Sequence, residues 1–411
     1  MNGSRGGLGG VVQDWQAVYA VKSGFGIRLA YRSGRIRWSR RISLGPFFVS
    51  ARLFRHLCGS LLSVVALVFA LAANSASQEY YAKYDLSPKP GVVNLLVQPM
   101  AYPLAFISSA MQRDRILRAE LAEQGLELRV FGFKKGNDIV NVATPNAFGM
   151  AFLGDMPTVS VIVKFPVAIA GLGKRNFSSV VSRDFSRLEE LKGRKIGYSA
   201  GSSSHLVLMR GLRASSMTDD DVQLVPMEPA NMPDALDSGA IEAFSAWEPT
   251  PSIALARSAK SRAIYRGMST DWVVMPMAWA LKQPRAAKVL VAGYVRSINW
   301  MRRSRSNLEQ VAGWVLSDGA SFTGEPSKLA LAKAADIAQK DLLDVPGAPS
   351  TPSLVDGVPP LSREFAFLKG IGRIPPDRDD SALRAAFQYD GLKTVQTDPR
   401  VHRLYTFEYD Q

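Results

Sequence analysis

Short apolar runs alternate with amphipathic segments along the chain from Gly91 onward. Apolar, β-branched runs of four to eight residues are typical of buried strands, and apolar residues at three- and four-residue spacing are typical of helices. Strands are predicted at residues 92–98, 126–133, 150–154, 167–172, 195–199, 222–227, 241–247 and 263–266. Helices are predicted at residues 104–124, 138–146, 187–193, 206–212 and 232–239. This alternation indicates the α/β class.

The order of these elements predicts two lobes. Residues 91–184 are expected to form the first part of lobe 1, residues 185–275 lobe 2, and residues 276–411 the return to lobe 1. Further helices are predicted at residues 285–303, 307–317, 325–340, 361–371 and 381–394. Ligands in such folds bind beyond the carboxyl ends of strands, which here means the cleft between the lobes. Crossings near residues 178–184 and 271–277 are expected to form the hinge.

A serine-rich turn lies between the strand predicted at 195–199 and the helix that follows it. Backbone N–H groups and hydroxyls converge in such a turn, and the positive end of the helix dipole points at the same place. An oxyanion such as sulfonate, nitrate, phosphate or carboxylate is the expected ligand of Gly201, Ser202, Ser203 and Ser204. The alternative is a tight turn with a serine N-cap. His205 either donates to the anion or packs in the core.

The composition of the chain argues against nucleic-acid binding and metal binding. The chain has 411 residues, a net charge of +14, one cysteine (Cys58) and three histidines. Residues 1–72 hold ten basic residues and one acid, so they carry nine of these positive charges. The remainder has no basic stripe interleaved with aromatic residues, so nucleic acid is not an expected partner. No disulfide framework or metal-ligand spacing occurs, and no metal is expected.

The N-terminal residues 1–72 are interpreted as an extension and a secretory signal peptide. Arg52 and Arg55 precede an apolar run at residues 61–71, and small residues follow it. This pattern predicts export to the periplasm; the alternative is an uncleaved anchor. About fifty residues upstream of a signal peptide are abnormal for that pattern, which suggests the hypothesis that translation starts near Val49.

Several motifs in sequence order resemble the solute-binding proteins of sulfonate/nitrate/taurine-type ABC transporters. They are Leu188–Gly197 (LEELKGRKIG), the Gly201–His205 turn with its helix, Ala235–Ala243 (ALDSGAIEA) and Trp247–Pro249; Gly154–Pro157 and Phe365–Pro375 are similar to two more. The resemblance spans residues 92–395. It implies a two-lobed periplasmic-binding-protein type II fold with C-terminal helices packed on lobe 1. It also implies a monomer that captures a small, organic anion for an ABC permease in the inner membrane, without cofactor or catalysis.

The resemblance adds further candidate ligand contacts. Gly154, Asp155 and Met156 form a turn that faces the cleft in the family; the alternative is simple helix capping by Asp155. Trp247 would line the cleft and cover an apolar part of the ligand. Glu248 either caps the following helix or pairs with an amine on the ligand. The opposite wall is assigned to Met100 and Tyr102.

Two other functions remain open on the same fold. One is an enzyme that makes a thiamine-pyrimidine or quinone precursor, which the export signal and the scarcity of cysteine and histidine disfavour. The other is a sensor that presents its ligand to a receptor instead of a transporter.

Overall fold

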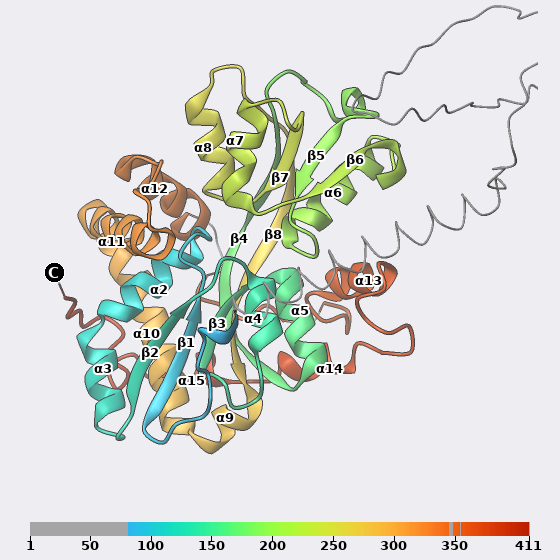
Figure 1. Cartoon of the computed structure of the whole chain (residues 1–411). Helices are drawn as coiled ribbons and strands as arrows, with labels where there is room; N and C mark the ends of the chain where they lie inside the picture. Colours follow the sequence, from blue (N-terminus) through green and yellow to red (C-terminus); the bar gives the residue numbers. More distant parts are fainter. Residues whose placement is uncertain (1–80, 345–347, 354, 411) are drawn as a thin grey trace, which may run out of the picture. The chain divides into compact units, whose positions relative to one another are not determined.

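Figure 1 shows a computed structural model that describes residues 81–344, 348–353 and 355–410. The predicted signal peptide, with Cys58 and His56, lies outside the described residues. One eight-stranded sheet runs through this part in the order β2-β1-β3-β8-β4-β7-β5-β6. Its strands are β1 (Val92–Val97), β2 (Glu127–Gly132), β3 (Met150–Gly154), β4 (Val167–Ser182), β5 (Lys195–Tyr198), β6 (Gln223–Pro226), β7 (Ala243–Ala246) and β8 (Arg262–Pro276).

Two long strands, β4 and β8, join the two halves of this sheet (Figure 1). They pair antiparallel from Val167↔Pro276 to Ser182↔Arg262. β3 pairs with one end of β8, whereas β7 pairs with the opposite end of β4. We call the β2-β1-β3 half with its helices lobe 1, the β7-β5-β6 half with its helices lobe 2, and the β4/β8 pair the hinge ribbon.

The hinge ribbon differs from the sequence prediction. The pattern predicts short strands at 167–172 and 263–266 and separate crossings near 178–184 and 271–277, whereas each hinge strand is continuous. The middle of the ribbon contains buried polar residues, including Lys174, Ser178, Ser269 and Asp271. Such residues interrupt the apolar pattern but not the strand, so the strand predicted at 167–172 is shorter than β4.

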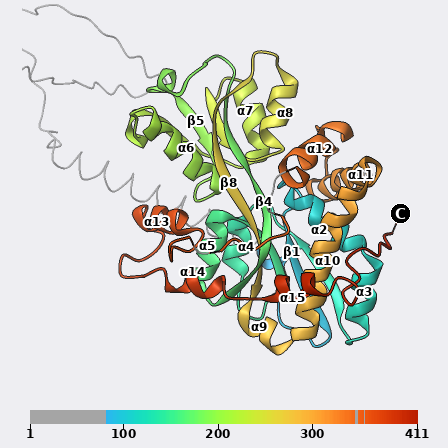
Figure 2. The same ribbon diagram turned by 180° about the vertical axis from the view of Figure 1, so that it is seen from behind.

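Helices cover both halves of the sheet. Lobe 2 contains α6 (Ser203–Ala214), α7 (Met232–Asp237) and α8 (Thr250–Arg257). The helices of lobe 1 are α2 (Leu104–Arg113), α3 (Arg115–Ala122), α4 (Gly136–Val142), α5 (Asp155–Lys164), α9 (Met277–Lys282), α10 (Pro284–Arg303), α11 (Arg305–Thr323), α12 (Leu331–Ala338), α13 (Ser362–Gly370), α14 (Ser381–Ala386) and α15 (Gly391–Thr397). From behind, in Figure 2, α10 and α15 cover lobe 1. α13 and α14 pack against α5, so the C-terminal helices lie on lobe 1 as expected.

A buried ion pair breaks the helix that the pattern predicts over residues 104–124. Asp114 separates α2 from α3, and its Oδ1 caps α3 by accepting from the Leu117 N–H at 3.0 Å. Arg296 of α10 donates from Nε to Asp114 Oδ2 at 2.7 Å, and both side chains are fully buried. Apolar periodicity continues through this break, so sequence alone does not reveal it. In the described ranges, no helix is both long and apolar enough to cross a bilayer.

Candidate ligand-binding cleft

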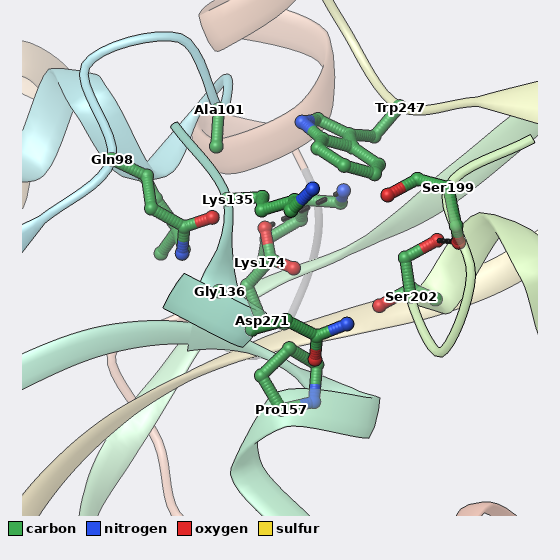
Figure 3. A pocket seen from close by; sticks show the side chains of 14 residues that line it. Gln98, Ala101, Lys135, Gly136, Pro157, Lys174, Ser199, Ser202, Trp247 and Asp271 are labelled. Atoms are coloured by element: carbon green, nitrogen blue, oxygen red, sulfur yellow. Dashed lines mark hydrogen bonds and ion pairs between the residues drawn. The ribbon is translucent and has the colours of Figure 1, made fainter. Parts of the chain in front are cut away.

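A small cavity lies between the lobes, where β1 and β3 end and α4 and α6 begin (Figure 3). Its volume is about 30 Å³. Lobe 2 contributes Ser199, Ser202, Ser203 and Trp247 to the lining. Lobe 1 and the hinge ribbon contribute Gln98, Ala101, Leu104, Lys135, Gly136, Asn137, Gly154, Pro157, Lys174 and Asp271.

The serine turn points the start of α6 into this cavity. Gly201 has φ +72°, a conformation that glycine adopts without strain. Ser202 is the N-cap: its Oγ accepts from the His205 N–H at 3.2 Å and donates to the Ser199 carbonyl at 2.6 Å. Ser203 is the first helical residue and lines the cavity. Ser204 is fully buried with its Oγ 2.9 Å from Ser202 Oγ, so it supports the turn from behind.

His205 packs in the core and does not line the cavity. Its Nδ1 accepts from the Gly201 N–H at 3.2 Å, and its ring lies between Tyr198 and Phe367. Burial and the nearby Arg373 guanidinium lower the pKa of His205 to about 4. The imidazole is therefore neutral at physiological pH and adds no charge to the turn.

The floor of the cleft holds a buried cation and its counter-ion. Lys174 of β4 and Asp271 of β8 are cross-strand partners, and Lys174 Nζ lies 3.4 Å from Asp271 Oδ2. Burial raises the pKa of Asp271, and the Lys174 ammonium opposes that rise. Both side chains point into the cavity between the lobes in Figure 3.

The Gly154 turn presents backbone rather than a side chain to the cavity. The helix begins one residue earlier than the predicted capping by Asp155 implies: Gly154 is the N-cap of α5 and Asp155 its first residue. Asp155 Oδ1 accepts from the Met156 N–H at 2.7 Å, and Oδ2 accepts from the Thr270 N–H at 3.2 Å. Burial, followed by the charge of Glu364, raises the pKa of Asp155 to about 7. Neither Asp155 nor the fully buried Met156 lines the cavity.

The remaining candidates divide between lining and support. Trp247 lines the cavity, and Glu248 Oε2 accepts from the Ser252 N–H at 3.2 Å, which caps α8. The Tyr102 N–H donates to the Glu248 carbonyl at 3.0 Å, but the Tyr102 ring is buried against Phe106. Met100 packs beside Gly319 of α11. Met100, Tyr102 and Glu248 are not among the lining residues.

Sequence reasoning missed several polar lining residues. Lys135 and Asn137 flank the start of α4, and Gln98 donates from Nε2 to the Phe152 carbonyl at 2.8 Å. Lys174 and Asp271 belong to strand segments beyond the predicted 167–172 run. The available signal was a lysine and an aspartate close to the apolar strand segments 167–172 and 272–276, because charged residues are buried in such strands only when paired.

Several contacts join the lobes around the cavity. Asn137 donates from Nδ2 to the Ala200 carbonyl at 2.9 Å, and Lys135 forms an ion pair with Glu228. On another side, Arg210 of α6 pairs with Glu364 of α13 at 3.1 Å. The small cavity volume therefore belongs to a closed arrangement of the two lobes.

The lining supplies two ammonium groups, three serine hydroxyls, two amides, one indole and the Asp271 carboxylate, which is paired with Lys174. The ammonium groups, polar donors and indole suit an anion with an apolar portion. Neither histidine of the described chain lines the cavity. Across the described ranges, no group of three or more His, Cys, Asp or Glu side chains is arranged to hold a metal ion.

Residues 167–316 match the model of the NMT1-like family. A protein of Escherichia coli (strain K12), provisionally named an aliphatic sulfonates-binding protein, is 38% identical over 66 residues. A provisionally named binding protein of Brucella abortus (strain 2308) is 34% identical over 70 residues. These matches cover 16% and 17% of this chain but only 21% and 22% of the two relatives, so the chain matches about a fifth of their length.

Solved structures match over a longer range at low identity. The periplasmic aliphatic sulphonate binding protein SsuA from Escherichia coli is 17% identical, with a TM-score of 0.54 over 74% of this chain and 100% of its own. The alkanesulfonate-binding protein SsuA from Xanthomonas axonopodis pv. citri, bound to MOPS, is 16% identical, with a TM-score of 0.54 over 72% of this chain and 98% of its own.

An enzyme also shares the fold. A mutant of DSZB in complex with biphenyl-2-sulfinic acid is 17% identical, with a TM-score of 0.51 over 74% of this chain and 99% of its own. These likenesses confirm the expected two-lobed α/β architecture. Residues 167–316 therefore match the NMT1-like family model, and the chain has the same fold as the periplasmic aliphatic sulphonate binding protein from Escherichia coli.

Proposed function

We propose that this chain is a periplasmic solute-binding protein that captures a small organic anion of the sulfonate class between its lobes. It acts as a monomer and delivers the anion to an ABC permease in the inner membrane. The observation that carries the proposal is the convergence of Lys135, Lys174 and the serine turn at the start of α6 on one interlobe cavity beside Trp247.

Each part of that lining has a role toward an organosulfonate. The N-terminus of α6 and the two lysines attract the negative charge. Hydrogen bonds to sulfonate oxygens from Ser203, from Asn137 and from the backbone N–H groups at the start of α6 are charge-assisted, at about 1.5–3 kcal/mol each before association costs are subtracted. The Trp247 indole covers the apolar chain of the ligand. Micromolar affinity or better follows from this set.

Binding couples to movement at the hinge ribbon. A cavity of about 30 Å³ is too small for an organosulfonate, so the lobes must part for entry and close less far around the ligand. Because the ligand contacts both lobes, it stabilises a closed form more than an open one. The permease then recognises the closed form.

The relatives support this choice of ligand class and location. The two SsuA proteins are named for aliphatic sulphonates and alkanesulfonates, one is called periplasmic, and the Xanthomonas protein holds MOPS. Taurine and nitrate, which the sequence motifs also suggest, belong in the same test.

The test is calorimetric titration of the purified chain with 1-butanesulfonate, MOPS, taurine, nitrate and benzoate. We expect a one-to-one complex with at least one sulfonate at micromolar Kd. We also expect Lys174→Met to weaken that complex at least 10-fold, whereas Lys333→Met, an exposed position on α12, leaves it unchanged. If none of the three sulfonates (1-butanesulfonate, MOPS and taurine) binds at millimolar concentration, the proposal fails.

A second candidate function is an enzyme acting on a sulfinate, because DSZB has the same fold and a complex with biphenyl-2-sulfinic acid. The lining of the cavity contains neither cysteine nor histidine, which favours binding over catalysis. Release of sulfite from biphenyl-2-sulfinic acid by the purified chain would support the enzyme, and intact sulfinate after prolonged incubation would exclude that activity.

A further inference from the structure

Two buried carboxyl groups lie directly beneath the serine turn. Asp271 of β8 lies between Gly154 of β3 and Lys174 of β4 in the strand register. A Cβ added to Gly154 would lie 2.8 Å from Ser203 Oγ and 3.5 Å from Asp271 Oδ1, so these groups surround one point. Asp155, the next residue, is hydrogen-bonded by the Ser203 side chain. The hydroxyl that faces the cleft therefore contacts a carboxyl on the other lobe.

The charges around the two carboxyl groups differ. Asp155 is acted on by Glu364 of α13 and by Asp271, both negative, and it accepts hydrogen bonds from Ser203, Thr270 and Met156. No ion pair to Asp155 occurs within the described ranges.

The partners of Asp155 have counter-ions of their own. Glu364 is paired with Arg210 of α6, and Asp271 with Lys174. Lys174 also attracts the buried Asp341, which lies beside Glu248 and Arg266. Lys174 on the cleft floor therefore attracts both Asp271 and Asp341, but it forms no ion pair with Asp155.

We propose that Asp155 and Asp271 form a proton-binding site that takes up a proton when an anion binds at the serine turn. This inference rests on the proposed function. An anion beside Ser203 adds a negative charge next to two carboxyl groups and competes with Asp271 for Lys174. Proton uptake removes that repulsion, since a nearby like charge raises the proton affinity of a carboxyl. A sulfonate is a strong acid and takes up no proton itself, so the linkage arises from the protein alone.

The consequence is a defined pH dependence of binding. Burial and its two acidic neighbours raise the pKa of Asp155 to about 7 in the unliganded chain, so the pair is partly protonated at neutral pH. An anion that raises this pKa to about 8 takes up about 0.4 proton at pH 7 and binds about 5-fold more tightly at pH 6 than at pH 8.

Calorimetric titration with 1-butanesulfonate at pH 7, in bis-Tris and in Tris buffer, measures the proton uptake, because the two buffers differ in ionisation enthalpy and neither is an anion that competes for the serine turn. We expect about 0.4 proton in the unmodified chain, and a pH-independent affinity with uptake near zero in Asp155→Asn. Asp336→Asn, which alters an exposed carboxyl on α12, serves as the matched control and keeps the full uptake. Asp271→Asn provides a second variant if Asp155→Asn does not fold.

Each outcome decides one of the two proposals. Binding of 1-butanesulfonate without proton uptake overturns the proton site and leaves the solute-binding function intact. If no sulfonate binds, the proposed function fails, and carbon-13 NMR titration of the carboxyl groups in the unliganded chain still tests the proton site. A resonance that titrates near pH 7 and disappears in Asp155→Asn supports the site, whereas titration of all aspartates below pH 5 overturns it.

Discussion

Lys174 and Asp271 face each other across the two hinge strands, with Lys174 Nζ 3.4 Å from Asp271 Oδ2 and with side chains only 2% and 9% exposed. The pair is therefore both a structural ion pair of the hinge ribbon and part of the wall that meets the ligand. The contribution of this pair to folding can be separated from its contribution to ligand binding only by substituting both Lys174 and Asp271.

A double-mutant cycle on this pair separates the two roles. Lys174→Met leaves a buried carboxylate without its partner, so we expect a loss of about 3–5 kcal/mol in the free energy of unfolding and at least 10-fold weaker sulfonate binding. Adding Asp271→Asn removes the unpaired charge and restores most of the stability, but not the binding. Urea unfolding and calorimetric titration of the three variants provide the measurements. Binding restored in the double variant would show that Lys174 does not contact the anion.

The adjacent serines of the turn offer a matched comparison. Ser202 caps α6, so Ser202→Ala is expected to lower the free energy of unfolding by about 1 kcal/mol and also to weaken sulfonate binding. Ser203 accepts no capping hydrogen bond, and Ser203→Ala is expected to weaken binding with a smaller loss of stability. Thermal unfolding and titration of the two variants test this order. Equal losses of stability would contradict the assignment of the cap.

The ion pair between Lys135 and Glu228 joins the lobes and is expected to favour closure. Both side chains are partly exposed, 27% and 37%, so the pair contributes at most about 1 kcal/mol. Glu228→Gln should weaken sulfonate binding by up to about 5-fold and enlarge the radius of gyration of the unliganded chain in X-ray scattering. Glu309→Gln, which removes the partner of Arg305 within α11, is the control and should change neither quantity.

Asp155 makes the folded state sensitive to pH. Its pKa is raised to about 7 in the folded chain, so the folded chain binds more protons than the unfolded chain between about pH 4 and pH 7. The free energy of unfolding contributed by this group is greatest below that window and falls as the pH rises through it. Asp155→Asn removes the dependence. Urea unfolding at pH 5, 6, 7 and 8 gives the free energy of unfolding of the unmodified chain and of Asp155→Asn. The advantage of the unmodified chain over the variant should shrink or reverse with rising pH. A difference that stays constant with pH would contradict the raised pKa.

Trp247 should set the preference for the apolar part of the ligand. In the unmodified chain, affinity is expected to rise along the series methane-, butane- and hexanesulfonate, because each added methylene that is buried contributes up to about 0.8 kcal/mol. Trp247→Ala should flatten this series without abolishing binding of methanesulfonate. A series that is equally steep in Trp247→Ala would place the alkyl chain elsewhere in the cleft.

The order of elements could be predicted because lobe 1 and lobe 2 are built from short apolar strands. The runs at 92–98 and 285–303 correspond closely to β1 and α10, and both elements are buried along most of their length. The break at Asp114 could not be predicted, because it depends on Arg296, which is distant in sequence and meets Asp114 only in the packed fold.

Lining residues of the cleft could be predicted only where they belong to a turn that the local sequence itself identifies. The serine turn and the Gly154 turn follow from strand-to-helix signals, and Ser202, Ser203, Gly154 and Trp247 do lie in the lining. Lys135 and Asn137 escaped prediction because nothing near them in sequence distinguishes a cleft residue from a solvated one. Their place in the lining results from the approach of lobe 2 to the start of α4, through the Asn137–Ala200 hydrogen bond.

The hinge ribbon has a practical consequence for engineering. Ser182 and Arg262 are register partners at the lobe 2 end of the ribbon, so the chain enters and leaves residues 183–261 at adjacent points. Residues 183–261 therefore form a cassette that two neighbouring peptide junctions connect to the host. Grafting the equivalent segment from a homologue would replace the serine turn but keep Lys174 and Asp271 of this chain. The ligand preference of the chimaera would show whether residues 183–261 or the rest of the chain determines specificity.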